Sequence, residues 1–115
     1  MSCDKCKHTV VDSCITQIRE LIPEAALYEQ LAEECSELAQ ACLKKARKLR
    51  DENYTPKTME EIDANLEEEY TDVRLAADTC GLTIDWNLAR TKSIRWIERN
   101  KNTKFLIEKN IKEHQ

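Results

Sequence analysis

The chain has 115 residues, 35% of them charged, and a formal net charge of −4 at pH 7. Because an acidic chain has no overall positive field, this balance argues against a general binder of nucleic-acid polymers or anionic membranes. With only one glycine and two prolines, the sequence predicts an all-α protein of one domain, residues 1–115. It has no apolar signal-like segment and no stretch near the roughly 20 apolar residues of a membrane span, so we expect the protein to be cytoplasmic.

Four potential zinc ligands lie near the N-terminus: Cys3, Cys6, His8 and Cys14. Thiolate and imidazole groups at such spacing can bind zinc tetrahedrally. Zinc modules usually bring a second spaced pair, however, and Cys14 also fits the apolar face of a first helix. We therefore interpret residues 1–9 as a frayed terminus with incidental thiols, and keep the zinc site as the open alternative.

A first helix is predicted by apolar residues at helical spacing, with Thr9 or Asp12 as its cap and Pro23 at its end. A long second helix is predicted from Glu24 to about Arg50. Its apolar residues are Leu27, Leu31, Cys35, Leu38, Cys42 and Leu49. We expect Cys35, Cys42 and Cys80 to be reduced core residues, because a free cysteine behaves as a small hydrophobe.

A third helix is predicted after the capping box of Thr58 and Glu61, and it ends at Gly81, which suits a left-handed C-cap. Asp85 can cap a further helix that runs to about Asn100, and residues 101–115 form a C-terminal tail or helix. The sequence therefore predicts a bundle of four or five helices. A lean core in a chain of this size also makes dimerisation an expectation.

A helical wheel separates the glutamates of the second helix, counting about 100° per residue. Glu33 faces water, whereas Glu34 and Glu37 lie together at the edge of the apolar stripe. On the third helix Glu69 falls in the middle of the apolar stripe, with Asp72 one turn further on. A carboxylate in that position must be protonated, paired with a cation or bound to a metal.

Two E-x-x-[ED] pairs on core-facing helix edges supply the oxygen ligands that Mg²⁺ or Mn²⁺ prefers. Iron is disfavoured because di-iron bundles use E-x-x-H pairs, and histidine occurs here only at positions 8 and 114. The alternative is that these carboxylates form ordinary ion pairs with Lys44, Lys45 or Arg74.

A basic line follows in the last predicted helix, where Lys92, Arg95 and Arg99 stand at helical spacing beside Leu88 and Trp96. Cationic groups near a carboxylate-bound metal would suit a polyphosphate. The alternative is a solvated helix face.

These motifs resemble the MazG-like branch of the all-α nucleoside triphosphate pyrophosphohydrolases. The family's E-E-x-x-E and E-x-x-D motifs are matched by "EECSE" at 33–37 and "EYTD" at 69–72, and the resemblance covers roughly a catalytic helical core, 24–100. It implies that Glu34, Glu37, Glu69 and Asp72 are catalytic Mg²⁺ ligands, with Glu33 less directly involved. Lys92, Arg95, Arg99 and Trp96 would contact substrate, Trp96 standing where many relatives have asparagine.

The resemblance further implies an enzyme that hydrolyses (deoxy)nucleoside triphosphates to monophosphate and pyrophosphate, as in the house-cleaning of non-standard nucleotides. It also implies a dimer or a dimer of dimers. Two alternatives stay open: a relative that acts on phosphoribosyl-type diphosphates, and a non-catalytic helical bundle that binds nucleotide or a protein partner.

Overall fold

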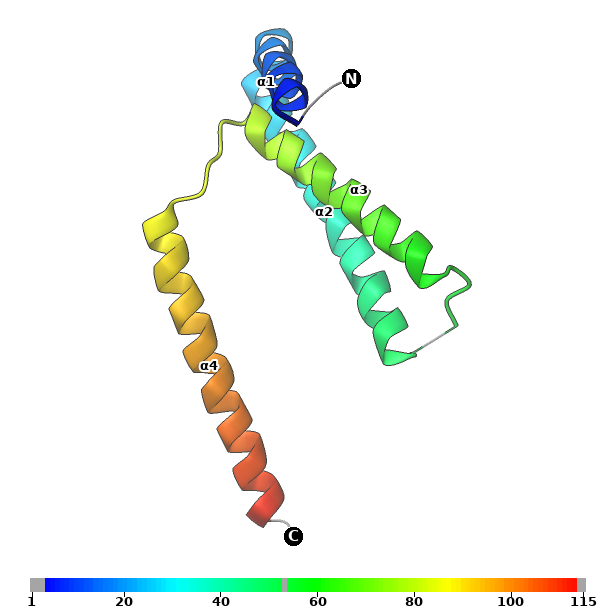
Figure 1. Cartoon of the computed structure of the whole chain (residues 1–115), viewed down its shortest axis with the longest axis vertical. Coiled ribbons are helices and arrows are strands. Elements are labelled where there is room, and N and C mark those ends of the chain that lie inside the picture. The colour runs from blue at the N-terminus through cyan, green and yellow to red at the C-terminus, as the bar shows by residue number, and fades with distance from the viewer. Residues whose placement is uncertain (1–3, 53, 114–115) are drawn as a thin grey trace. The chain divides into compact units, whose positions relative to one another are not determined.

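The computed structural model describes residues 4–52 and 54–113, which form four helices and no strand (Figure 1). The helices are α1 (Asp4–Leu21), α2 (Glu24–Arg50), α3 (Met59–Thr79) and α4 (Trp86–Glu113). The all-α prediction is confirmed. None of the helices, over the residues described, is long and apolar enough to cross a membrane.

The chain divides into two compact units, Met1–Thr83 and Ile84–Gln115. The first contains α1, α2 and α3, and the second contains α4. The predicted catalytic core, 24–100, includes parts of both units and stays a prediction. Each unit is therefore described by itself.

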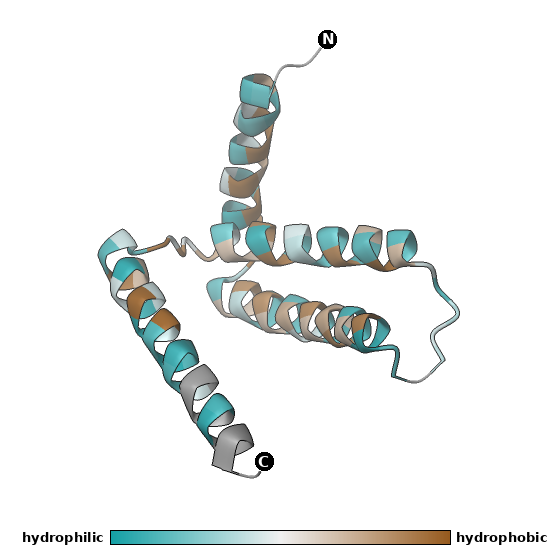
Figure 2. Cartoon of the chain, turned by 60° about the horizontal axis from the view of Figure 1, so that its bottom comes forward, coloured by the Kyte–Doolittle hydropathy of each residue, from teal (hydrophilic) through white to brown (hydrophobic). Residues whose placement is uncertain are grey.

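Helices α2 and α3 lie side by side as an antiparallel pair and form the main packed layer of the first unit (Figures 1 and 2). Each helix has buried or half-buried residues at alternating spacings of three and four. In α2 they are Leu27, Leu31, Glu34, Leu38, Ala41, Lys45 and Lys48. In α3 they are Met59, Ile62, Leu66, Glu69, Val73 and Ala76, and the C-cap residue Cys80 continues the series. This spacing is typical of helices that pack along one another. Each face includes one glutamate among its apolar residues.

The prediction that Cys35 and Cys42 belong to the core is wrong, because both are exposed, and Cys80 is half-buried. Helix α2 carries apolar and small residues over a wider arc than α3 covers. The α2 residues that pack on α3 are Leu38, Ala41 and the other buried or half-buried residues at the same spacing. The two cysteines lie outside this contact.

Local capping signals account for both ends of α3 and for the start of α4. The Thr58 hydroxyl accepts a hydrogen bond of 3.2 Å from the backbone N–H of Glu61, as the predicted capping box requires. Gly81 has a φ of 72°, and the backbone N–H groups of Gly81 and Leu82 donate to the carbonyls of Asp78 and Ala77. At α4 the Asp85 carboxylate accepts from the N–H of Leu88 at 3.0 Å. These predicted caps are confirmed.

Helix α1 begins at Asp4, before both predicted caps, and the Thr9 hydroxyl instead donates to the carbonyl of Lys5 inside the helix. Residues 4–9, for which a frayed terminus is expected, are thus helical, and residues 1–3 lie outside the described part. Figure 2 shows α1 projecting from the α2–α3 pair, with apolar residues along it.

Within the part of the chain that the structure describes, Cys6 and Cys14 do not come together as zinc ligands. Cys3 lies outside the described residues, and Cys6 and Cys14 are eight residues apart on α1. That separation corresponds to about 12 Å of helical rise, too far for both thiolates to reach one tetrahedral ion.

Helix α4 continues past Asn100 to Glu113, so the predicted tail, as far as it is described, belongs to one helix. There are accordingly four helices rather than five in the described chain. Among residues 86–103 only Ala89 is half-buried and the others are exposed.

Candidate functional site

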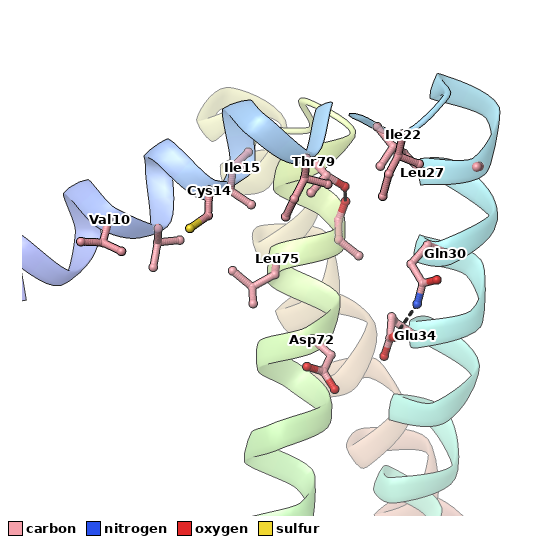
Figure 3. Close-up of a pocket in the computed structure, with 14 residues that line it drawn as sticks. Val10, Cys14, Ile15, Ile22, Leu27, Gln30, Glu34, Asp72, Leu75 and Thr79 are labelled. Carbon is pink, nitrogen blue, oxygen red and sulfur yellow. Dashed lines mark hydrogen bonds between the residues drawn. The ribbon is translucent and has the colours of Figure 1, made fainter. Parts of the chain in front are cut away.

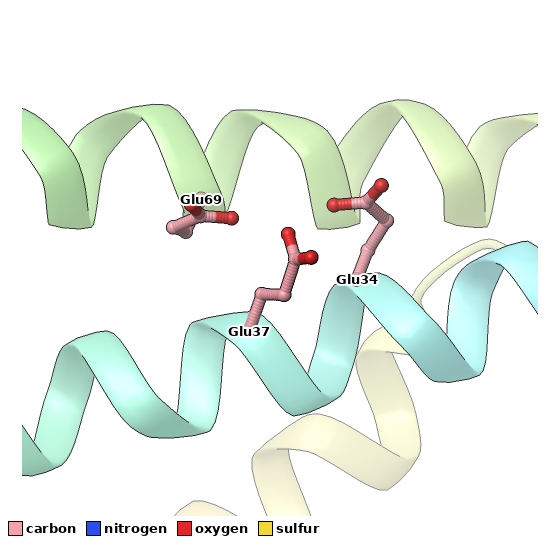
Figure 4. Close-up of side chains that lie close together, drawn as sticks. All are labelled: Glu34, Glu37 and Glu69. Carbon is pink, nitrogen blue, oxygen red and sulfur yellow. The ribbon is translucent and has the colours of Figure 1, made fainter.

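Three of the four predicted carboxylates meet between α2 and α3 (Figure 4). Glu34 and Glu37 are one turn apart on α2, and Glu69 extends toward them from α3. One oxygen from each of the three residues lies within 4.8 Å of the others. We call Glu34, Glu37 and Glu69 the carboxylate triad.

The members of the triad differ in exposure. Glu34 and Glu69 are half-buried because they occupy the packed faces of their helices, whereas Glu37 is exposed. The Gln30 side-chain amide donates a hydrogen bond of 2.7 Å to Glu34 Oε1. The other oxygens, Glu34 Oε2 and Glu69 Oε2, are shielded from solvent and have no hydrogen-bond partner among the described residues. Such unpartnered oxygens are costly to bury.

The environment of Glu69 favours its neutral form. Burial raises the pKa of its carboxyl group above the ordinary value, and the negative charge of Glu37, a hydrogen bond with Glu37 and the charges of Asp72 and Glu34 raise it further. Glu69 therefore lies where an ionised carboxylate needs a compensating positive charge.

The protein's own cations do not supply that charge in the described residues. The ion pair found there joins Lys45 to Asp63. The Arg74 guanidinium donates to the Tyr70 hydroxyl at 3.4 Å. The predicted alternative of ion pairs between the carboxylates and Lys44, Lys45 or Arg74 is thus not formed in this part of the chain.

The donor set fits a hard divalent cation. All three groups are carboxylates, which Mg²⁺ and Mn²⁺ prefer, and two of the oxygens lack any other partner. Asp72 is not part of the triad. It is half-buried one turn from Glu69, and Glu33 is exposed, as predicted.

An apolar groove of about 440 Å³ adjoins the triad at Glu34 (Figure 3). Aliphatic residues from α1, α2 and α3 line it, among them Ile18, Leu27 and Leu75, and Glu34 of α2 and Asp72 of α3 also line it. The sequence reasoning missed this groove because it forms only where α1 meets the α2–α3 pair. It also missed Gln30, for which the signal was its spacing of four residues from Glu34.

The predicted basic line lies on α4 and is described within the second unit. Lys92, Arg95, Trp96 and Arg99 line one surface depression there. The predicted spacing on one face is thus observed. This depression belongs to the second unit, whereas the triad belongs to the first.

The chain was compared with protein-family models, with curated proteins and with solved structures, and none of the three comparisons found a match.

Proposed function

We propose that the protein is an Mg²⁺-dependent nucleotide pyrophosphohydrolase that cleaves (deoxy)nucleoside triphosphates between the α and β phosphates. The observation that carries the proposal is the carboxylate triad, with two shielded oxygens that have no partner in the described chain. The resemblance of "EECSE" and "EYTD" to the motifs of the MazG-like pyrophosphohydrolases supports the substrate class.

Glu34, Glu37 and Glu69 would hold the ion, with Asp72 available one turn from Glu69. When bound, Mg²⁺ supplies Lewis-acid polarisation of phosphoryl oxygens and neutralises part of their charge. Glu37 is the exposed member of the triad, so we assign it to orient the attacking water and accept its proton. Gln30 holds Glu34 through their hydrogen bond.

In the reaction the water oxygen bonds to the α-phosphorus while the bond from that phosphorus to the α–β bridging oxygen breaks. Pyrophosphate leaves with the bridging oxygen, and the water proton passes to Glu37 and then to solvent. Lys92, Arg95 and Arg99, which line one depression of the second unit, are the residues that the resemblance assigns to phosphate contacts.

The groove beside Glu34 is the proposed place for the nucleoside. Its polar groups are few, and two of them are already used: the Gln30 amide donates to Glu34, and the Thr79 hydroxyl donates to the carbonyl of Ala76. We therefore expect weak discrimination between bases, because selection among bases depends on free hydrogen-bonding groups.

The test is pyrophosphate release from a panel of nucleoside triphosphates and phosphoribosyl-type diphosphates with Mg²⁺. We expect Glu69→Gln to lower the rate by at least about 100-fold, as loss of a metal-binding group does. Glu68→Gln is the matched control, since Glu68 is the exposed neighbour of Glu69, and it should keep the wild-type rate. Activity only on phosphoribosyl-type diphosphates would reassign the substrate.

Metal binding is measured separately by the melting temperature, Tm, with and without Mg²⁺. Added Mg²⁺ should raise the Tm of the wild type and of Glu68→Gln but not that of Glu69→Gln. A wild type that neither gains Tm nor releases pyrophosphate would exclude the enzyme and favour the non-catalytic bundle. That alternative draws support from the exposed apolar side chains of the described helices.

A further inference from the structure

The apolar groove and the carboxylate triad follow one another along the α2–α3 pair. On α2 the residues that line the groove extend from Ala26 to Glu34, and on α3 they extend from Asp72 to Thr79. Because the two helices are antiparallel, Glu34 and Asp72 lie at the same end of the groove (Figure 3). The other two members of the triad lie beyond them in that direction. A ligand held at the triad can therefore extend its organic group along the groove.

The lining of the groove is aliphatic except at a few positions. The exceptions are Cys14, Gln30, Thr79 and the two carboxylates at the triad end. Both uncharged polar side chains already have a partner, because Gln30 donates to Glu34 and Thr79 donates to the carbonyl of Ala76. In the part of the chain that the structure describes, no aromatic side chain lines the groove. An organic group there meets methyl and methylene groups and no ring on which to stack.

These surroundings suit an aliphatic chain better than a nucleobase. A base presents ring nitrogens, amino groups and carbonyl groups, and each of them loses hydrogen bonds to water when it is buried without a partner. An aliphatic chain has no such groups, and its transfer out of water is favourable.

The size of the groove fits a chain of moderate length. Its volume of about 440 Å³ lies in the range of small-molecule sites. Ala26 and Glu34 are eight residues apart on α2, which corresponds to about 12 Å of helical rise. With carbon–carbon bonds of about 1.5 Å, an extended chain of about ten carbons has this length.

We propose that the site takes, besides nucleotides, organic diphosphates whose organic group is an aliphatic chain of up to about ten carbons. The diphosphate would lie at the triad and the chain along the groove. This inference rests on the proposed function, because it uses the same ion and the same attacking water.

The reaction on such a diphosphate is the one proposed above with a different leaving group. The water oxygen bonds to the α-phosphorus while the bond from that phosphorus to the bridging oxygen breaks. Inorganic phosphate leaves with the bridging oxygen. One proton of the water passes to Glu37, and the other remains on the alkyl monophosphate.

The test is a series of n-alkyl diphosphates from butyl to dodecyl with Mg²⁺, followed by release of inorganic phosphate. Their non-hydrolysable methylene-bridged analogues give the dissociation constant, Kd, by calorimetry. The Kd should fall about twofold to fourfold for each added methylene, because each one leaves water, and it should level off at about ten carbons. The lower value allows for a chain that is covered only in part, since Leu75 of the lining is 37% exposed.

Two variants test the place of the chain. Leu75→Gln puts an amide into the groove, and we expect it to raise the Kd of the decyl analogue about tenfold and to leave that of the butyl analogue nearly unchanged. Leu43→Gln is the matched control, because Leu43 is an exposed leucine of α2 that does not line the groove. Ala26→Phe fills the groove at the end far from the triad, so the Kd should level off at a shorter chain. Circular dichroism checks that the variants remain helical.

The cysteines report occupancy independently of activity. Cys14 and Cys42 are both exposed, and only Cys14 lines the groove. Decanol in EDTA probes the groove without metal or phosphate, and the decyl analogue with Mg²⁺ probes the groove and the triad together. Both should slow the reaction of Cys14 with iodoacetamide, measured by mass spectrometry, and leave that of Cys42 unchanged.

The outcomes separate this inference from the proposed function. Hydrolysis of nucleoside triphosphates, with a Kd of the alkyl analogues that does not depend on chain length, would overturn the inference and leave the proposed function standing. Protection of Cys14 by decanol in EDTA, without binding of alkyl diphosphates in Mg²⁺ and without hydrolysis of any nucleotide, would refute the proposed function and, with it, the use of the groove for diphosphates.

Discussion

The carboxyl group of Glu69 lies between α2 and α3 beside two other carboxyl groups, with no cation paired to it in the described chain. In the absence of metal, removing its charge should help folding even though it should abolish activity. Glu69, which we expect to matter most for the reaction, thus lowers the stability of the metal-free fold, as is common at functional sites.

The pH dependence of stability follows from the raised pKa of Glu69. Because the folded protein binds this proton more tightly than the unfolded chain does, the contribution of Glu69 to stability rises as pH falls from neutrality through its raised pKa. The gain is complete below the ordinary pKa of glutamate, about 4.3. Urea unfolding in EDTA at a series of pH values, for wild type and Glu69→Gln, measures this contribution, together with that of the carboxylates coupled to Glu69, as the difference between the two proteins.

At neutral pH without metal, Glu69→Gln should therefore be more stable than wild type, and the two should converge as the pH is lowered. Carboxylates remote from Glu69 cancel in the difference, whereas Glu34, Glu37 and Asp72 interact with its charge and contribute to it. A difference that does not change with pH would show that the Glu69 charge is already compensated in the folded protein.

At the scale of the elements, α3 and α4 each begin at a single capping side chain, Thr58 and Asp85. The Thr58 hydroxyl accepts the N–H of Glu61, and an alanine there leaves that donor without its cap. We expect Thr58→Ala to lower the free energy of unfolding by about 1 kcal/mol, measured by urea unfolding. Thr71→Ala is the control, because the Thr71 hydroxyl only donates to the Glu67 carbonyl within the helix, and its effect should be smaller. Equal losses would mean that the cap does not limit the stability of α3.

The sequence predicts these ends well because a cap is local: Thr58, Gly81 and Asp85 each act on backbone groups a few residues away. It predicts the place of Glu69 for a related reason, since apolar residues surround it on its own helix. Which side of α2 faces α3, by contrast, is not decided by local sequence. Leu38 and Cys42 are equally plausible on a wheel, and only the packing of α3 selects the first and leaves the second exposed.

The same reason explains why Asp72 lies apart from the triad although its motif position pairs it with Glu69. One E-x-x-D step along α3 moves the side chain from the α2-facing side to the groove beside α1. The groove itself depends on three helices, so no single helical pattern in the sequence contains it.

At the scale of the whole molecule, the acidic triad and the basic line lie in different units of the chain. The proposed function assigns metal binding to the triad in the first unit and contacts with phosphate to the basic line in the second. Binding of metal and binding of phosphate should then be separable by mutation, because the residues responsible are separate in the fold.

Arg95→Ala tests this division. It removes one cation from the depression that also contains Lys92 and Arg99, and we expect the KM for a nucleoside triphosphate to rise about tenfold through the loss of a charged phosphate contact. The rise in Tm on adding Mg²⁺ should be unchanged, since no ligand of the ion is altered. Arg90→Ala is the matched control, because Arg90 is exposed on the same helix and does not line that depression. If both variants keep the wild-type KM, the basic line takes no part in binding the phosphates. If Arg95→Ala instead loses the response to Mg²⁺, the two units are coupled before substrate binds.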